Sequence, residues 1–265
     1  MENKKKKKKE SAPSSLMHYT DIDALSYILN PGVKDANGIR YMDFRFSHPS
    51  QCNDPMEQNF YKNALYTGSE ISELLKASVK ANEEKTGQPF IFSMIHHKRS
   101  VMRQCPLTEI PMWNMYANKS DKVGVRLRLD YKELTSFCKD KNIDIFPCAY
   151  LNKEEMRQVT ENIRKNQLNL RVNDYARIYK QEIKFKPIEW NYENEYRMVI
   201  WTNDFETVDD KRYVYVKIPL HILKTIQISP FAEYEENKEK IERMLNSIRM
   251  KNNEIKIEKS KILIR

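Results

Sequence analysis

The segment KVGVRLRLD, residues 122–130, alternates apolar side chains with polar residues and one glycine. Val123, Val125, Leu127 and Leu129 fall on one face of such a segment. A period of two predicts a strand that is buried on one face only, which is typical of antiparallel sheets. A chain with this segment therefore needs a sheet with one covered face.

The rest of the chain mixes helical and strand-like patterns. Helical periodicity or capping residues predict helices over 21–30, 69–85, 110–120, 153–179 and 234–250. Short apolar or alternating runs predict strands over 39–46, 89–94, 146–151, 195–201, 212–220, 224–230 and 259–265. Only five glycines occur, and neither GxGxxG nor GxxxxGK[ST] is present, which argues against a nucleotide fold built on glycine-rich turns. We expect an α+β fold, a single mixed domain with a largely antiparallel sheet and flanking helices.

The formal net charge of +9 is unevenly distributed. Residues 1–10, MENKKKKKKE, hold six lysines and two glutamates, and such a block repels itself. We expect residues 1–14 to form a disordered lysine-rich tail and residues 15–265 to form the domain. A solvated tail and a tail attracted to nucleic acid are both compatible with this composition.

Several classes of protein are disfavoured by composition. The longest apolar runs are too short to span a membrane, and no apolar segment follows the N-terminal lysines as in a signal peptide. We expect a cytoplasmic protein without membrane contact. Four cysteines lie far apart without a CxxC pair, so we expect neither structural zinc nor a disulfide framework, and we predict no metal ligands.

The segment EWNYENEYRMVIW, residues 189–201, places charged side chains at the entrance of an apolar strand. Glu195 and Arg197 are two residues apart, so a strand directs both to the same face. Two interpretations are open: the charges line a pocket, or they form a structural ion pair.

Three further motifs carry chemically useful side chains. His18, Tyr19 and Thr20 stand together at the end of a short apolar segment, and CNDPMEQ (52–58) has the composition of a turn. Trp113 and Tyr116 are spaced to share one helical face. Such a pair serves either as core or as a platform for a flat ligand.

A metal-dependent nuclease is a further alternative. Asp174 followed by Glu182 and Lys184 imitates the acidic residue and ExK triplet of such enzymes, in which carboxylates hold Mg²⁺. The same EIK triplet recurs at 254–256, so a chain rich in Glu, Ile and Lys produces it readily.

Five motifs in order resemble a bacterial family, domain of unknown function 2971. They are HYT (18–20), NDPME (53–57), MWNMYAN (112–118), KVGV (122–125) and WNYENEYR (190–197). One departure is Cys52, which stands where the family usually has an aromatic residue before NDP.

The opening HYT, followed by a capped helix and a strand, is similar to the start of ADP-ribosyltransferase-like proteins. This resemblance implies an ADP-ribosyltransferase-like core that uses NAD. By it, His18 would bind the NAD ribose, Tyr41 would pack on the nicotinamide, and Glu195 would support cleavage of the glycosidic bond. Glu193 is the alternative to Glu195 in that role.

The remaining motif residues are then expected to converge on the NAD site. They are Tyr19, Thr20, Asn53, Asp54, Glu57, Trp113, Tyr116 and Arg197. The resemblance implies ADP-ribosyl transfer to a macromolecular acceptor (protein or nucleic acid) or cleavage of NAD, with a role in bacterial conflict, as a toxin or in phage defence. A non-catalytic module that binds nucleic acid or protein is the alternative outside enzymology.

Overall fold

A computed structural model gives the fold of the chain. It describes residues 12–29, 36, 38–52, 77, 80–81, 83–96, 106–118, 122–166, 177, 180–248 and 254–262. Most of the helix predicted over 69–85 lies outside these ranges, as do Asn53, Asp54 and Glu57. Within them, no helix is both long enough and apolar enough to cross a membrane.

Helices and strands alternate irregularly along the chain. The strands are β1 (Ser15–Asp21), β2 (Tyr41–Ser47), β3 (Gln88–Ile95), β4 (Gly124–Asp130), β5 (Asp144–Pro147), β6 (Ala149–Leu151), β7 (Phe185–Pro187), β8 (Glu195–Thr202), β9 (Glu206–Val208), β10 (Lys211–Pro219), β11 (Leu223–Ile228) and β12 (Lys256–Lys259). The α-helices are α1 (Ile22–Ile28), α4 (Pro106–Met112), α5 (Tyr131–Asp140), α6 (Lys153–Asn166) and α8 (Tyr234–Ser247). Short 3-10 or π turns are η1 (Pro49–Gln51), η2 (Trp113–Ala117), η4 (Ile188–Glu193) and η5 (Leu220–Ile222).

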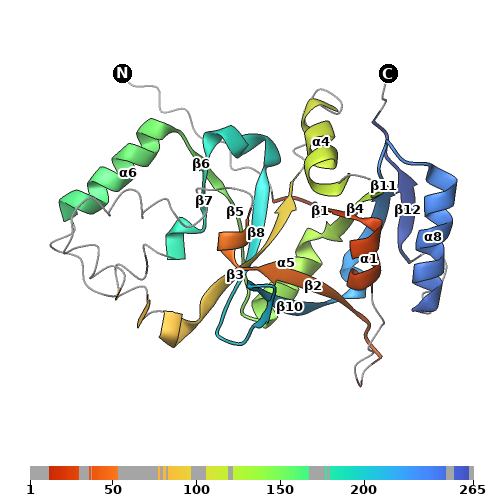
Figure 1. The fold of residues 1–265 in the computed structure, drawn as a ribbon, viewed down its shortest axis with the longest axis horizontal. Helices are drawn as coiled ribbons and strands as arrows, with labels where there is room; N and C mark the ends of the chain where they lie inside the picture. The colour runs from red at the N-terminus through yellow and green to blue at the C-terminus, as the bar shows by residue number, and fades with distance from the viewer. Residues whose placement is uncertain are drawn as a thin grey trace.

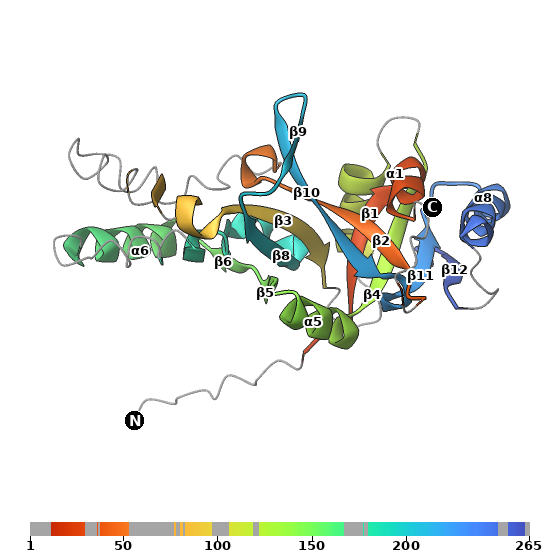
Figure 2. The ribbon, with the colours of Figure 1, turned by 90° about the horizontal axis from the view of Figure 1, so that it is seen from below.

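A ten-stranded sheet organises the molecule, with β6 and β7 paired separately. Its main path runs β12-β11-β4-β1-β3-β2-β10-β9, while β8 pairs with β3 and β5. Among the described pairings, β11–β12 and β6–β7 are parallel and the others are antiparallel. Figures 1 and 2 show this sheet at the centre, with α8 at one end and α6 at the other. The predicted α+β class with a largely antiparallel sheet and flanking helices is confirmed.

The two edges of β3 are used differently. One edge pairs with β8 along the whole strand, from Gln88 to Ile95. Because a strand has only two edges, β1 and β2 must share the other, where they reach Ile95 and Ile91 respectively. These positions are four residues, or about 13 Å, apart. Beyond them β1 and β2 run apart in Figure 1, so the sheet opens beside the middle of β3.

The helices cover the sheet where apolar side chains emerge from it. α1 begins at the N-cap Asp21, whose carboxylate accepts from the Ala24 amide, and it contacts β1, β2 and β4. α5 packs on β1, β4 and β5, and α8 packs on β11 and β12. The alternating face predicted for 122–130 is confirmed, because Val125, Leu127 and Leu129 are fully buried in the main core.

The elements differ from expectation at several places, of which the C-terminal ones and the segment 146–151 are examples. The last strand covers 256–259 rather than 259–265, and the last helix ends at Ser247. The strand predicted over 146–151 is interrupted at Cys148, whose amide donates to the Glu195 carbonyl, so β5 and β6 belong to different sheets. The local sequence pattern does not predict these pairings, because they join residues that are far apart in the chain.

Two residues that the sequence assigned to the tail contact the rest of the fold. Pro13 is buried, and the Ser14 carbonyl accepts a hydrogen bond from the Tyr131 amide. The boundary after residue 14 and the single domain over 15–265 stay predictions.

Gly124 connects two of the family-like motifs in space, MWNMYAN (112–118) and KVGV (122–125). Its amide donates to the Asn118 side-chain oxygen, which ties the end of η2 to the start of β4. A β-carbon at position 124 would lie 2.4 Å from that oxygen and 2.7 Å from the Ala117 β-carbon. The close approach leaves room for glycine alone.

Gly124→Ala should therefore lower the free energy of unfolding by about 1–3 kcal/mol, the usual cost of forcing extra atoms into a packed site. Urea denaturation measures this, with the exposed Lys132→Ala as a control that should change little. Equal stability of Gly124→Ala and wild type would contradict the close packing.

Candidate active site

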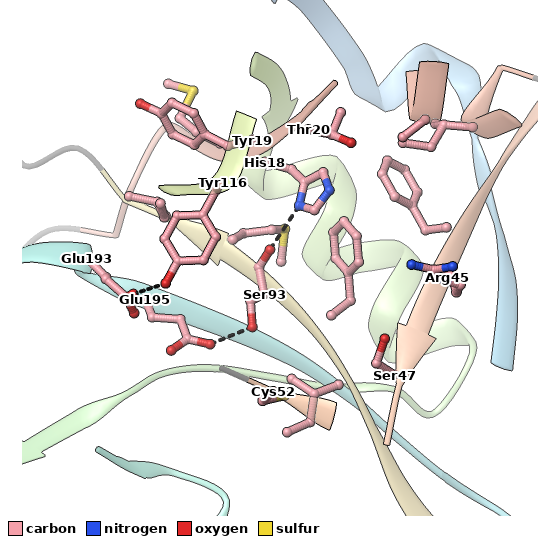
Figure 3. A pocket seen from close by; sticks show the side chains of 18 of the residues that line it. His18, Tyr19, Thr20, Arg45, Ser47, Cys52, Ser93, Tyr116, Glu193 and Glu195 are labelled. Atoms are coloured by element: carbon pink, nitrogen blue, oxygen red, sulfur yellow. Dashed lines mark hydrogen bonds between the residues drawn. The ribbon is translucent and has the colours of Figure 1, made fainter. Parts of the chain in front are cut away.

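A cavity of about 680 Å³ lies where the sheet opens. It is lined from β1, α1, β2, η1, β3, α4, η2, β7, η4, β8 and β10, so it draws on segments from Met17 to Tyr215. Figure 3 shows the side chains that face it. His18, Ser93, Tyr116, Glu193 and Glu195 lie on one side of the cavity, and Arg45 lies on the other.

His18 is fixed by its neighbours in one tautomer. Its Nδ1 lies 3.0 Å from the Ser93 carbonyl oxygen. Because a carbonyl can only accept, Nδ1 carries the hydrogen, and Nε2 is left as an acceptor. The ring packs 4.3 Å from Phe92 and 6.0 Å from Phe44, centroid to centroid. Burial among these rings lowers the pKa of His18 to about 4, against a smaller opposite effect of the Ser93 bond, so the imidazole is neutral at pH 7.

Glu195 is held by four hydrogen bonds to its carboxylate. Oε1 accepts from Ser93 Oγ at 2.6 Å and from Arg197 Nε at 2.9 Å. Oε2 accepts from Lys186 Nζ at 2.9 Å and from Arg197 Nη2 at 3.1 Å. A carboxylate offers about four lone-pair positions, so these donors fill its acceptor capacity. Burial alone would raise the pKa of Glu195, but the two cations and these hydrogen bonds hold it below its ordinary value of 4.5.

Glu193 has fewer partners within the part of the chain that the structure describes. Its Oε1 accepts from the Tyr116 hydroxyl and its Oε2 accepts from Lys186 Nζ at 2.5 Å. Two of its lone-pair positions are therefore left for a ligand. Asn194, between the two glutamates, has φ 44° and ψ 50°, a left-handed conformation that asparagine tolerates. This residue joins η4 to β8, and it brings both carboxylates to one lysine.

The charges of this cluster balance. Glu193, Glu195, Lys186 and Arg197 are each at most 7% exposed, and they sum to zero. Arg197 lies behind Glu195 and donates through Nη1 to the Ile183 carbonyl, so the carboxylates rather than the guanidinium line the cavity. The cavity wall thus carries both carboxylates and the Lys186 ammonium, and the Arg197 guanidinium lies behind it.

Arg45 gives the opposite side of the cavity a positive charge. Its guanidinium carbon lies 4.5 Å from the centroid of the Tyr213 ring, on the neighbouring strand β10. Among the described residues it makes no ion pair. An exposed, unneutralised guanidinium in a cavity wall suits a phosphate or a carboxylate.

The structure separates the predicted site residues into three groups. His18, Tyr19, Thr20, Tyr116, Glu193 and Glu195 line the cavity. Trp113 and Arg197 are buried behind it, at 0% and 1% exposure, and Trp113 packs edge-on against Tyr19. Tyr41, at the start of β2 opposite Pro219, is not among the described cavity residues, and Asn53, Asp54 and Glu57 lie outside the described part of the chain.

Tyr19 is tied to the layer beneath the cavity. Its hydroxyl accepts from Arg126 Nη1 at 2.9 Å, and Arg126 also pairs with Glu109. Burial, opposed in part by Arg126, raises the pKa of Tyr19 to about 12. The phenol is therefore neutral and positions the motif rather than carrying charge.

Sequence reasoning missed Lys186, Ser93 and Arg45. Lys186 stands in a three-residue strand that pairs with β6, and no local pattern marks it. Ser93 interrupts the apolar run of β3, and a polar residue at that position is the one signal that was available. Arg45 was read as part of a strand without a role.

The residues of the nuclease hypothesis lie elsewhere. Glu182 is buried, and the Lys184 ammonium lies 5.1 Å from the Phe146 ring centroid. Asp174 is outside the described residues, and within them no group of three His, Cys, Asp or Glu side chains is placed to hold a metal ion.

Comparison with known proteins identifies one family. A family model described as "Protein of unknown function (DUF2971)" matches residues 112–198, which include three of the five motifs in full. The resemblance to that family is confirmed over this segment. No curated protein matches the chain.

Two solved structures of Thermus sp. 2.9 DarT are similar to this fold. One is in complex with NAD+, with a TM-score of 0.38, 12% identity and coverage of 96% of this chain and 98% of that chain. The other is in complex with ADP-ribosylated ssDNA, with a TM-score of 0.37, 12% identity and coverage of 94% and 95%. At these TM-scores the likeness carries no inference about this chain.

The lowered pKa of Glu195 predicts a pH-dependent contribution to stability. That contribution is fully present above the unfolded-state value and is lost as the pH falls through the lower folded-state pKa. Glu195→Gln should therefore be about 3–5 kcal/mol less stable than wild type at pH 7, because it breaks a buried pair, and the difference should shrink below pH 4.5.

Urea denaturation at several pH values measures the difference, with Glu154→Gln as the control. Hydrogen bonds from Arg157, above all, lower the pKa of Glu154 to about 2, but that pair is exposed on α6. Solvent screens it, so the control should lose no measurable stability. Similar behaviour of the two variants would contradict the buried network.

Proposed function

We propose that the protein binds NAD in this cavity and breaks the bond between nicotinamide and ribose. ADP-ribose is then transferred to a macromolecular acceptor, protein or nucleic acid, or to water. The observation that supports this most is the pair of glutamates at the cavity wall, beside a neutral histidine and across from Arg45, which has no ion partner among the described residues.

The charges of the cavity are complementary to those of NAD. The nicotinamide ring carries a positive charge and the diphosphate carries negative charge. Glu193 and Glu195 suit the first, and Arg45 suits the second. A volume of about 680 Å³ lies within the usual range of 300–1,000 Å³ for ligand sites.

The reaction itself needs a negative charge beside the sugar. When the glycosidic bond breaks, its electrons leave with nicotinamide, and positive charge develops on the ribose. A carboxylate fixed at that point stabilises the transition state more than the ground state. Four donors fix Glu195, so it needs little reorganisation as the bond breaks.

Glu193 and His18 would contact hydroxyl groups. Glu193 has two acceptor positions left and can bind a ribose hydroxyl or the nucleophile of the acceptor. The His18 ring is neutral and its Nε2 is an acceptor, so it can accept a hydrogen bond from a hydroxyl group of the NAD ribose. The aromatic surface that was expected of Tyr41 is supplied around the cavity by Phe44, Phe92 and Trp190.

A protein with this activity would suit bacterial conflict, as a toxin or in phage defence, which is the role implied by the family resemblance.

Glu193→Gln should lower the rate of nicotinamide release from NAD by about 10²–10³, the usual effect of removing one preorganised electrostatic contact. NAD should still raise the melting temperature of the variant, because the negative charge matters chiefly as the bond breaks. The assay is run with and without protein and single-stranded nucleic acid as acceptors. Tyr192→Phe, which removes only the hydroxyl that contacts Met115, is the control and should leave the rate unchanged.

A wild-type protein that neither releases nicotinamide nor is stabilised by NAD would end the enzymatic proposal. Binding of nucleic acid or protein without turnover would instead favour the non-catalytic module.

A further inference from the structure

One lysine is shared by the two glutamates of the cavity. Lys186 Nζ lies 2.5 Å from Glu193 Oε2 and 2.9 Å from Glu195 Oε2, and its side chain is 7% exposed. The Trp190 ring lies over the ammonium, with its centroid 4.9 Å from Nζ. Lys186 belongs to β7, outside the main sheet, so it reaches the cavity from a different element than either glutamate.

Two carboxylates that share a buried site do not both stay ionised without compensation. Like charges in such a site raise the pKa of one of them strongly, and the pair then shares a proton. Arg197 compensates one negative charge by binding Glu195 through Nε and Nη2. Lys186 is the cation that compensates the second.

The surrounding titratable groups do not take over this role. Groups near the cluster come from β1, η2, β6, η4 and β8: His18, Tyr116, Tyr150, Tyr192 and Arg197. Burial raises the pKa of each of the three tyrosines, and it lowers that of His18 to about 4. These four groups are neutral at pH 7, and Arg197 is already bound to Glu195.

We propose that Lys186 is a positioning residue that keeps Glu193 and Glu195 ionised together at neutral pH and so sets the acid limit of the reaction. The part that concerns the reaction rests on the proposed function, whereas the ionisation of the glutamates does not. The raised pKa of Lys186, which the two carboxylates produce against the effect of burial, agrees with this arrangement.

Infrared spectroscopy tests the ionisation without any activity assay. Lys186→Met at pH 7 should show the C=O band of one protonated carboxyl group that wild type lacks. The double variant K186M/E193Q removes one carboxylate together with the lysine, so the charges balance again. The extra band should be absent from it, and its melting temperature should exceed that of K186M.

The pH profile of nicotinamide release tests the consequence for the reaction. The wild-type rate should be flat from about pH 6 to 9, because Lys186 and Arg197 together balance the charges of the two carboxylates. For Lys186→Met the rate should fall about tenfold per pH unit below a midpoint in the neutral or alkaline range, as for a single required ionisation. Lys186→Arg keeps the charge and should restore the flat profile.

Two results would overturn the proposal. One is a folded K186M protein with no protonated carboxyl and a wild-type pH profile. The other is equal destabilisation of K186M and K186M/E193Q, which would mean that the lysine acts through packing alone. If the protonated band appears but wild type never cleaves NAD, the charge balance stands and only the proposed function fails.

Discussion

The pairing of β3 is the constraint on which the rest of the structure depends. Full pairing with β8 on one edge fixes Ser93 opposite Arg197 and Ile95 opposite Glu195. The other edge is shared by β1 and β2, which diverge from points four residues apart. The opening between them exposes the polar side chain of Ser93 to a cavity rather than to another strand. The same pairing thus forms the cavity and delivers its chemical groups.

The buried ion cluster is better explained by function than by stability. Four charged side chains at most 7% exposed carry a desolvation cost of several kcal/mol per ion before their attraction is counted. Apolar side chains of similar volume often stabilise such a site equally well. A cluster whose two carboxylates face a cavity, with a guanidinium behind them, has the arrangement needed to act on a ligand that gains positive charge. Asn194 supports this view, because its left-handed backbone turns Glu193 toward the same lysine as Glu195.

Local pattern predicted the features that depend on local spacing. Strict alternation predicted the buried face of β4. The two-residue spacing of Glu195 and Arg197 predicted that the two side chains share a face, and they form an ion pair there. Glu195 also lines the cavity, so the ion-pair and the pocket interpretations both apply to it. Trp113 and Tyr116 have different roles, because η2 is a π turn rather than an α-helix. The Trp113 side chain is buried in the core, whereas the Tyr116 hydroxyl donates to Glu193. Lys186 was invisible because its position follows from the pairing of β6 with β7, a contact between residues more than thirty positions apart. Arg45 was likewise set by the divergence of β2, which no single segment encodes.

The central claim is that the cavity holds NAD with the nicotinamide ribose at the two glutamates. The most direct measurement is a crystal structure with a carbocyclic NAD analogue whose glycosidic bond cannot be cleaved. The account predicts the sugar ring beside Glu193, Glu195 and His18, with the diphosphate within reach of Arg45. Density for the analogue with the diphosphate at the glutamates, or bound outside this cavity, would contradict it.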